Sequence, residues 1–321
     1  MNNNKRDIGI DVIKCIAALL ITNSHFDLLY PYKFLATGGS IGNSLFFFAS
    51  GFLLFLKPMG RFDNWYKKRI NRIYPTIFAW AILCTLFLGE DENIIYLILY
   101  SGEWFISCIM IYYVIIYFIN KFMRNNLMLS WGISLLIFIV WYIIIDKPSD
   151  YDMYGITYFK YGFYFLFMLM GAIMGASKKQ LIYNFKSDFL KLIGCCVLYY
   201  LIAIGAKKFE IINILQMLSL APLIGLTYYF YKVANGSVLK KVYQNNIGGA
   251  FIKIIGGLCL EIYLVQVSLF TDRFNNYFPL NIIGTFLAIL IAAYILRCSS
   301  RLFSQIFKEQ DLDWKGIISL Y

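Results

Sequence analysis

Residues 6–26 read RDIGIDVIKCIAALLITNSHF, an apolar run that carries Asp11 and Lys14 near its beginning and His25 near its end. An apolar segment of about 20 residues is long enough to cross a bilayer as a helix. Ionisable side chains inside such a segment are costly and usually functional. Because His25 is the only histidine of the chain, any imidazole chemistry must use this one residue.

The remaining sequence is also strongly apolar. Of its 321 residues, 60% are hydrophobic and only 15% are charged, whereas about 45–50% apolar residues are typical of soluble domains. The sequence therefore predicts an all-α integral membrane protein, a polytopic bundle of about ten transmembrane helices. The expected spans are 8–29, 41–57, 73–88, 94–120, 129–146, 158–176, 189–206, 210–231, 250–271 and 282–306.

The formal charge of +11 is unevenly distributed along the chain. Lys and Arg accumulate in the cytoplasmic loops of membrane proteins. If the N-terminus is cytoplasmic, the segment 57–72 is the most basic cytoplasmic loop, and few of the 29 basic residues fall in the outer loops: Lys33, Lys147, Lys160, Lys207, Lys208 and Arg273. We therefore expect both termini in the cytoplasm. The excess of basic residues then sets the orientation of the chain in the membrane, and we expect no nucleic-acid partner.

A single membrane domain is expected over residues 1–321. The sequence has only six prolines and no Pro/Gly/Ser-rich linker, and its apolar spans continue almost to the end. We expect neither a cleaved signal peptide nor a fused extracytoplasmic domain. The seven cysteines lie in predicted spans without a C-x-x-C pair, which indicates inert thiols and, with one histidine, no metal site.

Helix geometry places Asp11, Lys14 and His25 on one side of the first span. At about 1.5 Å of rise per residue, Asp11 and His25 lie about 21 Å apart, so Asp11 cannot orient the imidazole. By depth, Asp27 and Glu103 are the better carboxylate partners. The alternative is structural: His25 is then an ordinary interior histidine, and Asp11 with Lys14 is a local i,i+3 ion pair.

Two further segments combine small or basic residues. Residues 38–52 read GGSIGNSLFFFASGF and place Ser50 beside Gly51 within the second span; small residues there usually serve helix packing. Lys68, Arg69 and Arg72 precede the third span, and Arg69 and Arg72 share a helix face. Paired guanidiniums suit phosphate oxygens, although basic residues at this position also anchor a span on the cytoplasmic side.

Taken together, these segments resemble the acyltransferase-3 family of bacterial membrane-bound acyltransferases. The first segment matches a D-x-x-R/K helix that ends in His, and residues 38–52 match a GG-x-x-G-x-x-x-FF-x-x-SGF helix. An R-x-x-R-I-x-P motif, a Trp-Phe pair and a late IYL segment follow. The residues that match are Asp11, Lys14, His25, Gly38, Gly39, Gly42, Phe46, Phe47, Ser50, Gly51, Phe52, Arg69, Arg72, Ile73, Pro75, Trp104, Phe105, Ile262, Tyr263 and Leu264.

The resemblance implies an O-acyltransferase of the bacterial cytoplasmic membrane. Such an enzyme moves an acyl group, usually acetyl from acetyl-CoA, to a sugar hydroxyl of a cell-surface polysaccharide, lipid-linked oligosaccharide or glycolipid. It implies catalytic roles for His25, Ser50 and Glu103, binding of CoA by Asp11, Lys14, Arg69 and Arg72, and binding of the acceptor by Trp104, Glu261 and Tyr263. Direct transfer and a covalent acyl-His or acyl-Ser relay both remain open, as does assembly into a homo-oligomer.

The main alternative is a transporter or flippase for glycans or lipids. In that interpretation Asp11, Lys14, His25 and Glu261 form a charged pathway through the bilayer. Dependence on CoA separates the two functions, because an exporter needs no thioester.

Overall fold

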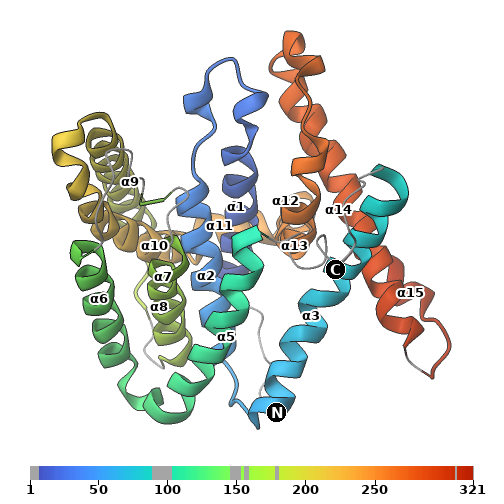
Figure 1. Cartoon of the computed structure of the whole chain (residues 1–321), viewed down its shortest axis with the longest axis horizontal. Coiled ribbons are helices and arrows are strands. Elements are labelled where there is room, and N and C mark those ends of the chain that lie inside the picture. The colour runs from blue at the N-terminus through green and yellow to red at the C-terminus, as the bar shows by residue number, and fades with distance from the viewer. Residues whose placement is uncertain are drawn as a thin grey trace. The chain divides into compact units, whose positions relative to one another are not determined.

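The computed structural model describes residues 7–88, 103–144, 153–154, 159–177, 181–307 and 309–320. Within these ranges every regular element is a helix, and there is no strand (Figure 1). This confirms the predicted all-α class.

The helices follow the apolar runs of the sequence. The first half forms α1 (Ile8–Ser24), α2 (Gly39–Phe55), α3 (Phe62–Leu83), α5 (Glu103–Met123) and α6 (Leu127–Ile144). The second half forms α7 (Lys160–Phe163), α8 (Phe165–Ala176), α9 (Phe185–Lys208), α10 (Leu220–Ala234), α11 (Ser237–Gln244), α12 (Asn246–Gly257), α13 (Cys259–Val265), α14 (Leu280–Ile306) and α15 (Trp314–Ile318). The 3-10 segments include η1 (Phe26–Leu28), η2 (Lys33–Leu35), η4 (Arg124–Asn126), η5 (Glu210–Ser219), η6 (Val267–Leu269) and η7 (Asp272–Tyr277).

Four helical stretches of the described chain are long and apolar enough to cross a membrane. They are Lys33–Phe55, Trp104–Ile144, Phe185–Ala206 and Leu280–Ile306, and the bent pair α12–α13 gives a fifth if counted as one span. The stretch Trp104–Ile144 contains both α5 and α6. Apolar side chains of α9 such as Leu201 and Ile204 are more than 60% exposed, as expected for a surface that faces lipid. The protein is a helical membrane protein.

The structure corrects the predicted loop over residues 57–72, because α3 begins at Phe62 within it. Trp65 is buried on this first part of α3, whereas Lys67 and Lys68 are exposed. An apolar residue on one face and charges on the other make this segment an amphipathic helix. The helix thus begins more than two turns before residue 73, where the third span is predicted to start.

Two predicted spans are interrupted. The range 210–231 contains the 3-10 segment η5 followed by α10, and Pro222 lies in the first turn of α10, where a missing N–H costs nothing. The range 250–271 is divided between α12 and α13, which meet at an angle of 61° just after Gly256 and Gly257. Paired glycines are a common cause of such kinks.

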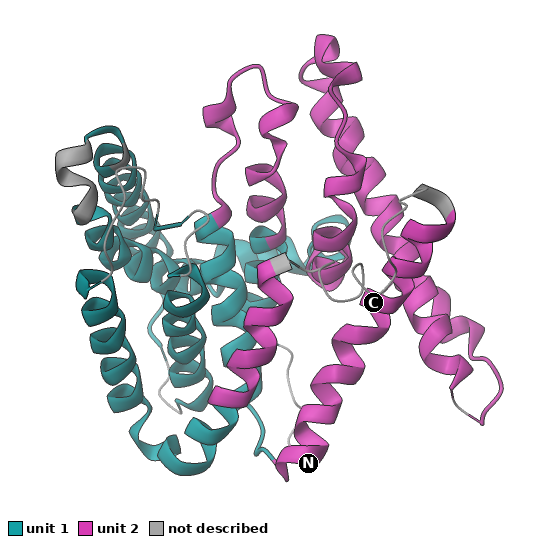
Figure 2. Ribbon diagram, in the orientation of Figure 1, with its two compact units in different colours: residues 1–17, 40–59, 116–252 teal, residues 18–39, 60–115, 253–321 magenta. Residues whose placement is uncertain are grey.

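The chain divides into two compact units (Figure 2). Unit 1 contains residues 1–17, 40–59 and 116–252, and unit 2 contains residues 18–39, 60–115 and 253–321. Both units draw on distant parts of the sequence, so α1, α5 and α12 each contribute residues to both.

Unit 1 contains a close contact between α2 and α8. A Cβ atom on Gly51 would collide with the Met168 carbonyl of α8, and a Cβ atom on Gly171 would collide with the Phe48 carbonyl of α2. Gly175 of α8 approaches the Phe52 carbonyl in the same way. Glycines four residues apart allow two helix backbones to meet closely. The small residues of the second span therefore serve packing, as one reading of the sequence predicts.

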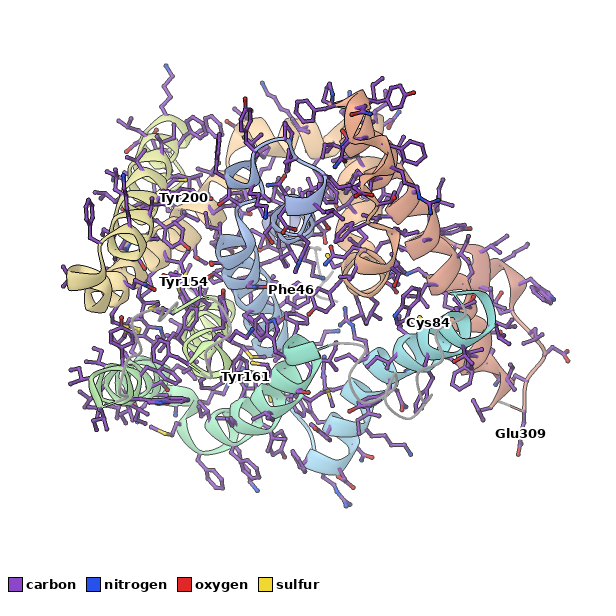
Figure 3. All side chains as sticks on the ribbon, turned by 45° about the horizontal axis from the view of Figure 1, so that its top comes forward. Phe46, Cys84, Tyr154, Tyr161, Tyr200 and Glu309 are labelled. Atoms are coloured by element: carbon purple, nitrogen blue, oxygen red, sulfur yellow. The ribbon has the colours of Figure 1, made fainter. Side chains whose placement is uncertain are left out.

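Aromatic rings also pack against one another in the unit 1 core. The ring of Tyr154, which is labelled in Figure 3, lies 5.5 Å from that of Phe163 and 5.7 Å from that of Tyr199. Edge contacts at such distances are the favoured geometry for aromatic pairs.

In unit 2, α14 packs against α3 and α13. A buried hydrogen bond of 3.0 Å joins the hydroxyls of Thr76 on α3 and Ser300 on α14. Residues near the start of α14 and in η7 contact the segment that follows α1.

Candidate functional site

His25 is the first residue after α1 and belongs to unit 2. Its backbone N–H donates to the Thr22 carbonyl at 3.1 Å, and its side chain is partly exposed. The 3-10 turn η1 follows directly. The imidazole is thus attached to a turn between two helical segments rather than to the middle of a span.

Asn23 fixes the loop that follows this turn. Its amide nitrogen donates to the carbonyls of Leu35 and Thr37, each at 2.9 Å, and its amide oxygen accepts from the Tyr30 hydroxyl at 2.6 Å. Because all polar atoms of the Asn23 side chain are engaged, the loop is tied to the last turn of α1.

Two asparagines that come late in the sequence also hold the backbone of η1 by hydrogen bonds. Asn275 donates to the Leu28 carbonyl at 2.8 Å, and Asn281 donates to the Leu29 carbonyl at 2.8 Å. Asn281 also donates to the amide oxygen of Asn275 at 3.1 Å. A catalytic side chain benefits from a backbone fixed in this way, because its geometry is set before substrate binds.

The ring of Phe26 completes the anchor beside His25. Phe26 is 3% exposed, and its ring meets that of Phe270 edge-on at 5.6 Å. Phe270 directly follows η6, so the segment after α13 packs against the turn that carries the histidine.

The glycine pair at the start of the second span lies against the same end of α1. Gly38 has φ of +100°, a conformation that L side chains rarely adopt. A Cβ atom on Gly39 would lie 2.6 Å from Ser24 Oγ. The pair thus allows the chain to turn back and pass close to the residue preceding His25.

Arg69 and Arg72 lie on α3, also in unit 2. The Arg69 guanidinium lies 5.2 Å from the Trp65 ring and 5.8 Å from the Tyr113 ring, whereas Arg72 is exposed. Burial lowers the pKa of Arg69 from its usual range; the Tyr113 hydroxyl opposes this, and the charge of Arg72 adds to it. A half-buried guanidinium beside a second cation forms a suitable place for an anion.

The predicted acceptor residues lie on α5 and α13. Trp104 contacts Phe105 edge-on at 5.9 Å, and the Phe105 ring lies 5.0 Å from that of Tyr263. These rings form one aromatic group within unit 2. Glu103 is the first residue of α5, and its side chain lies outside the described part of the structure.

Glu261 has a partner that the sequence did not suggest. Arg297 of α14 lies 3.2 Å from each of its carboxylate oxygens and also donates to the Gly257 carbonyl. Only 15% of the Arg297 side chain and 7% of the Glu261 side chain are exposed. The ion pair therefore ties α14 to the bend between α12 and α13, and the Glu261 carboxylate is already engaged. Its predicted contact with substrate stays a prediction.

Three of the predicted residues belong to unit 1. Asp11 is buried in the first turn of α1 and accepts a hydrogen bond of 2.8 Å from the Tyr243 hydroxyl. Lys14 lies one turn further along α1, and Ser50 is partly exposed on α2. The other predicted site residues, His25, Arg69, Arg72, Glu103, Trp104, Glu261 and Tyr263, all belong to unit 2.

Sequence reasoning missed the residues that position these groups. Arg297 had a usable signal, since a cation within an apolar span calls for a partner of opposite charge. Asn23, Asn275 and Asn281 had none, because asparagine is common in turns and nothing in their spacing connects them to His25.

The fold and these groups define an integral membrane protein whose single histidine lies on an anchored turn of unit 2, the unit that also contains the paired arginines and the aromatic group. The family model of the acyltransferase domain matches residues 7–298, nearly the whole chain. The chain belongs to the acyltransferase-3 family, which points to a membrane acyltransferase. Neither the curated proteins nor the solved structures compared with the chain gave a match.

Proposed function

We propose that the protein transfers an acetyl group from acetyl-CoA to a sugar hydroxyl of a cell-surface polysaccharide, lipid-linked oligosaccharide or glycolipid. The observation that carries this proposal is the family match over residues 7–298. It is supported by the anchored turn that carries the only histidine of the chain.

His25 acts as the general base in this proposal. Free imidazole titrates near neutral pH, which suits it to take the proton of a hydroxyl group. The hydroxyl oxygen then attacks the thioester carbonyl, the carbon–sulfur bond breaks, and the thiolate of CoA receives the proton back from the imidazolium. Glu103 has a supporting catalytic role, and Trp104 and Tyr263 offer aromatic faces for a sugar ring.

Arg69 and Arg72 hold the phosphates of CoA in this proposal. Guanidinium groups donate paired hydrogen bonds to phosphate oxygens. The support is the position of the two charges on one face of α3, where Trp65 and Tyr113 fix the Arg69 side chain.

The proposed setting is the cytoplasmic membrane of a bacterium, with about ten spans and both termini on the cytoplasmic side. Its support is the excess of Lys and Arg in alternate loops of the sequence. This orientation places Arg69 and Arg72 toward the compartment that supplies acetyl-CoA.

The experiment is a transfer assay with purified full-length protein in lipid nanodiscs. Radiolabelled acetyl-CoA is added with extracted surface glycolipids, and label in the glycolipid fraction is counted. Label transfer supports the proposal. A folded protein that neither binds nor consumes acetyl-CoA contradicts it and favours the transporter alternative.

A further inference from the structure

Buried polar atoms without a hydrogen-bond partner are concentrated in the unit that contains His25. Among the described residues these atoms are Thr22 Oγ1, Arg69 Nε, Asn120 Nδ2, Gln266 Oε1 and Asn281 Oδ1, and all but the atom of Asn120 belong to unit 2. An unpaired buried polar atom costs free energy of folding. Such atoms are rare in native proteins, and a catalytic role, a bound water or an ion is a common explanation for one.

Three of these atoms lie in the segments that hold the histidine turn. Thr22 is the residue whose carbonyl accepts the His25 N–H. Asn281 binds the Leu29 carbonyl, and Gln266 lies one turn before Phe270, whose ring packs on Phe26.

The side chains of these three residues are almost completely enclosed. Thr22 and Gln266 are each 1% exposed, and Asn281 is 5% exposed. A substrate therefore reaches their oxygens only when neighbouring side chains move aside.

The chemistry of these atoms limits what can satisfy them. The Asn281 amide orientation is fixed, because its nitrogen donates both to the Leu29 carbonyl and to Asn275 Oδ1. Its oxygen, like the amide oxygen of Gln266, can only accept. The Thr22 hydroxyl can accept or donate. A phosphate or carboxylate offers acceptors alone and does not fit.

We propose that Thr22, Gln266 and Asn281 form a subsite beside His25 that binds neutral O–H or N–H groups of a substrate. This inference rests on the proposed function, in which two substrates carry such groups. They are the hydroxyls of the acceptor sugar and the amide N–H and hydroxyl groups of the pantetheine arm of acetyl-CoA. Both would have to come close to His25 for transfer.

The test uses Thr22→Val and Gln266→Met. Both substitutions remove the unpaired oxygen and change the side-chain volume little. The chain offers matched controls whose oxygens are satisfied. Thr76 shares its hydrogen bond with Ser300, and Gln216 Oε1 accepts from the Met153 N–H at 2.9 Å. Thr76→Val and Gln216→Met therefore remove the same atoms from equally buried positions that have a partner.

Thermal unfolding of each purified full-length variant is measured alone, with acetyl-CoA, and with extracted surface glycolipids. We expect Thr22→Val and Gln266→Met to unfold at or above the wild-type temperature, because the oxygens that they remove have no hydrogen-bond partner in the protein. In wild type, acetyl-CoA or the glycolipids should raise the unfolding temperature. The two variants should lose most of that rise for one of these two ligands. Both controls should unfold earlier and keep that rise. The probe whose effect is lost identifies the substrate that the subsite binds.

Steady-state transfer gives the second readout. The KM for the same substrate should rise about three- to tenfold in Thr22→Val and Gln266→Met. The proposal of a subsite is overturned if Thr22→Val and Gln266→Met keep both the full ligand-induced rise in unfolding temperature and the wild-type KM. A wild type that shows a ligand-induced rise but transfers no acetyl group contradicts the proposed function and leaves the subsite standing. A wild type that responds to neither probe contradicts both.

Discussion

Side-chain amides hold the backbone around His25. Asn275 and Asn281 reach η1 from 247 and 252 residues away in the sequence. His25 itself was predictable because it is the only histidine and lies at the end of an apolar run. Its anchors were not, since sequence spacing carries no information about contacts over such separations.

Asn275→Ala tests the anchor. The substitution removes the hydrogen bonds to the Leu28 carbonyl and from Asn281, which should lower the free energy of unfolding by about 1–2 kcal/mol. A displaced imidazole should lower kcat by about tenfold or more and leave the KM for acetyl-CoA unchanged. The exposed neighbour Asn276→Ala is the control and should behave as wild type. A normal kcat in a destabilised Asn275→Ala protein would limit the residue to a structural role.

The paired guanidiniums give a second prediction at this scale. Arg69→Gln with Arg72→Gln should raise the Kd for acetyl-CoA by about tenfold or more, because hydrogen bonds to charged phosphates are lost. Isothermal titration calorimetry measures the Kd. The control is Arg61→Gln with Lys67→Gln, which removes two charges from the exposed start of the same helix. Equal weakening in both double variants would indicate general attraction by positive charge instead of a specific phosphate site.

The position and length of each helix depend on where the apolar runs of the sequence lie and on which residues interrupt them. Runs of hydrophobic residues located α1, α2, α9 and α14 within a few residues. The change from η5 to α10 and the bend after Gly257 were missed, because hydropathy averages over single breaks. The early start of α3 was missed for the opposite reason: its first part is polar on one face and was interpreted as a loop.

The close contact of α2 and α8 can be tested with two helical glycines. Gly171→Ala should lower the unfolding temperature in nanodiscs, because the new methyl group collides with the Phe48 carbonyl. Gly132→Ala on α6 meets nothing within 4 Å and should stabilise by up to about 1 kcal/mol through helix propensity. Similar effects of the two substitutions would be inconsistent with the packing of α2 on α8.

The ion pair at the bend between α12 and α13 is the second test at this scale. Arg297→Gln leaves Glu261 buried without its cation and should destabilise by about 3–5 kcal/mol. Adding Glu261→Gln should restore much of the unfolding temperature, because the uncompensated charge is then removed. If the double variant is as unstable as Arg297→Gln alone, the pair does not act as a unit.

For the whole molecule, composition was enough to predict a helical membrane protein, and family membership adds the class of reaction. The ten predicted site residues divide between units 1 and 2, with Asp11, Lys14 and Ser50 in the first and the other seven in the second. Sequence motifs could not show this division, since each unit is assembled from segments distant in the chain.

The orientation of the chain is a prediction for the molecule as a whole. Reporter fusions to each terminus should be active only in the cytoplasm, because the basic loops favour that side. Alkaline phosphatase, which requires the oxidising exterior, and green fluorescent protein give opposite readouts. Phosphatase activity from either terminus would reverse the assignment of the acetyl-CoA side.

The most direct test of the account is acetyl transfer by His25→Ala. Wild type and variant are purified in nanodiscs, and transfer from radiolabelled acetyl-CoA to extracted glycolipids is measured with thermal unfolding and acetyl-CoA binding. We predict a wild-type unfolding temperature, wild-type binding and a loss of transfer of about 100-fold or more, the usual contribution of a general base. A folded His25→Ala protein that transfers acetyl groups at the wild-type rate would contradict the central role of His25.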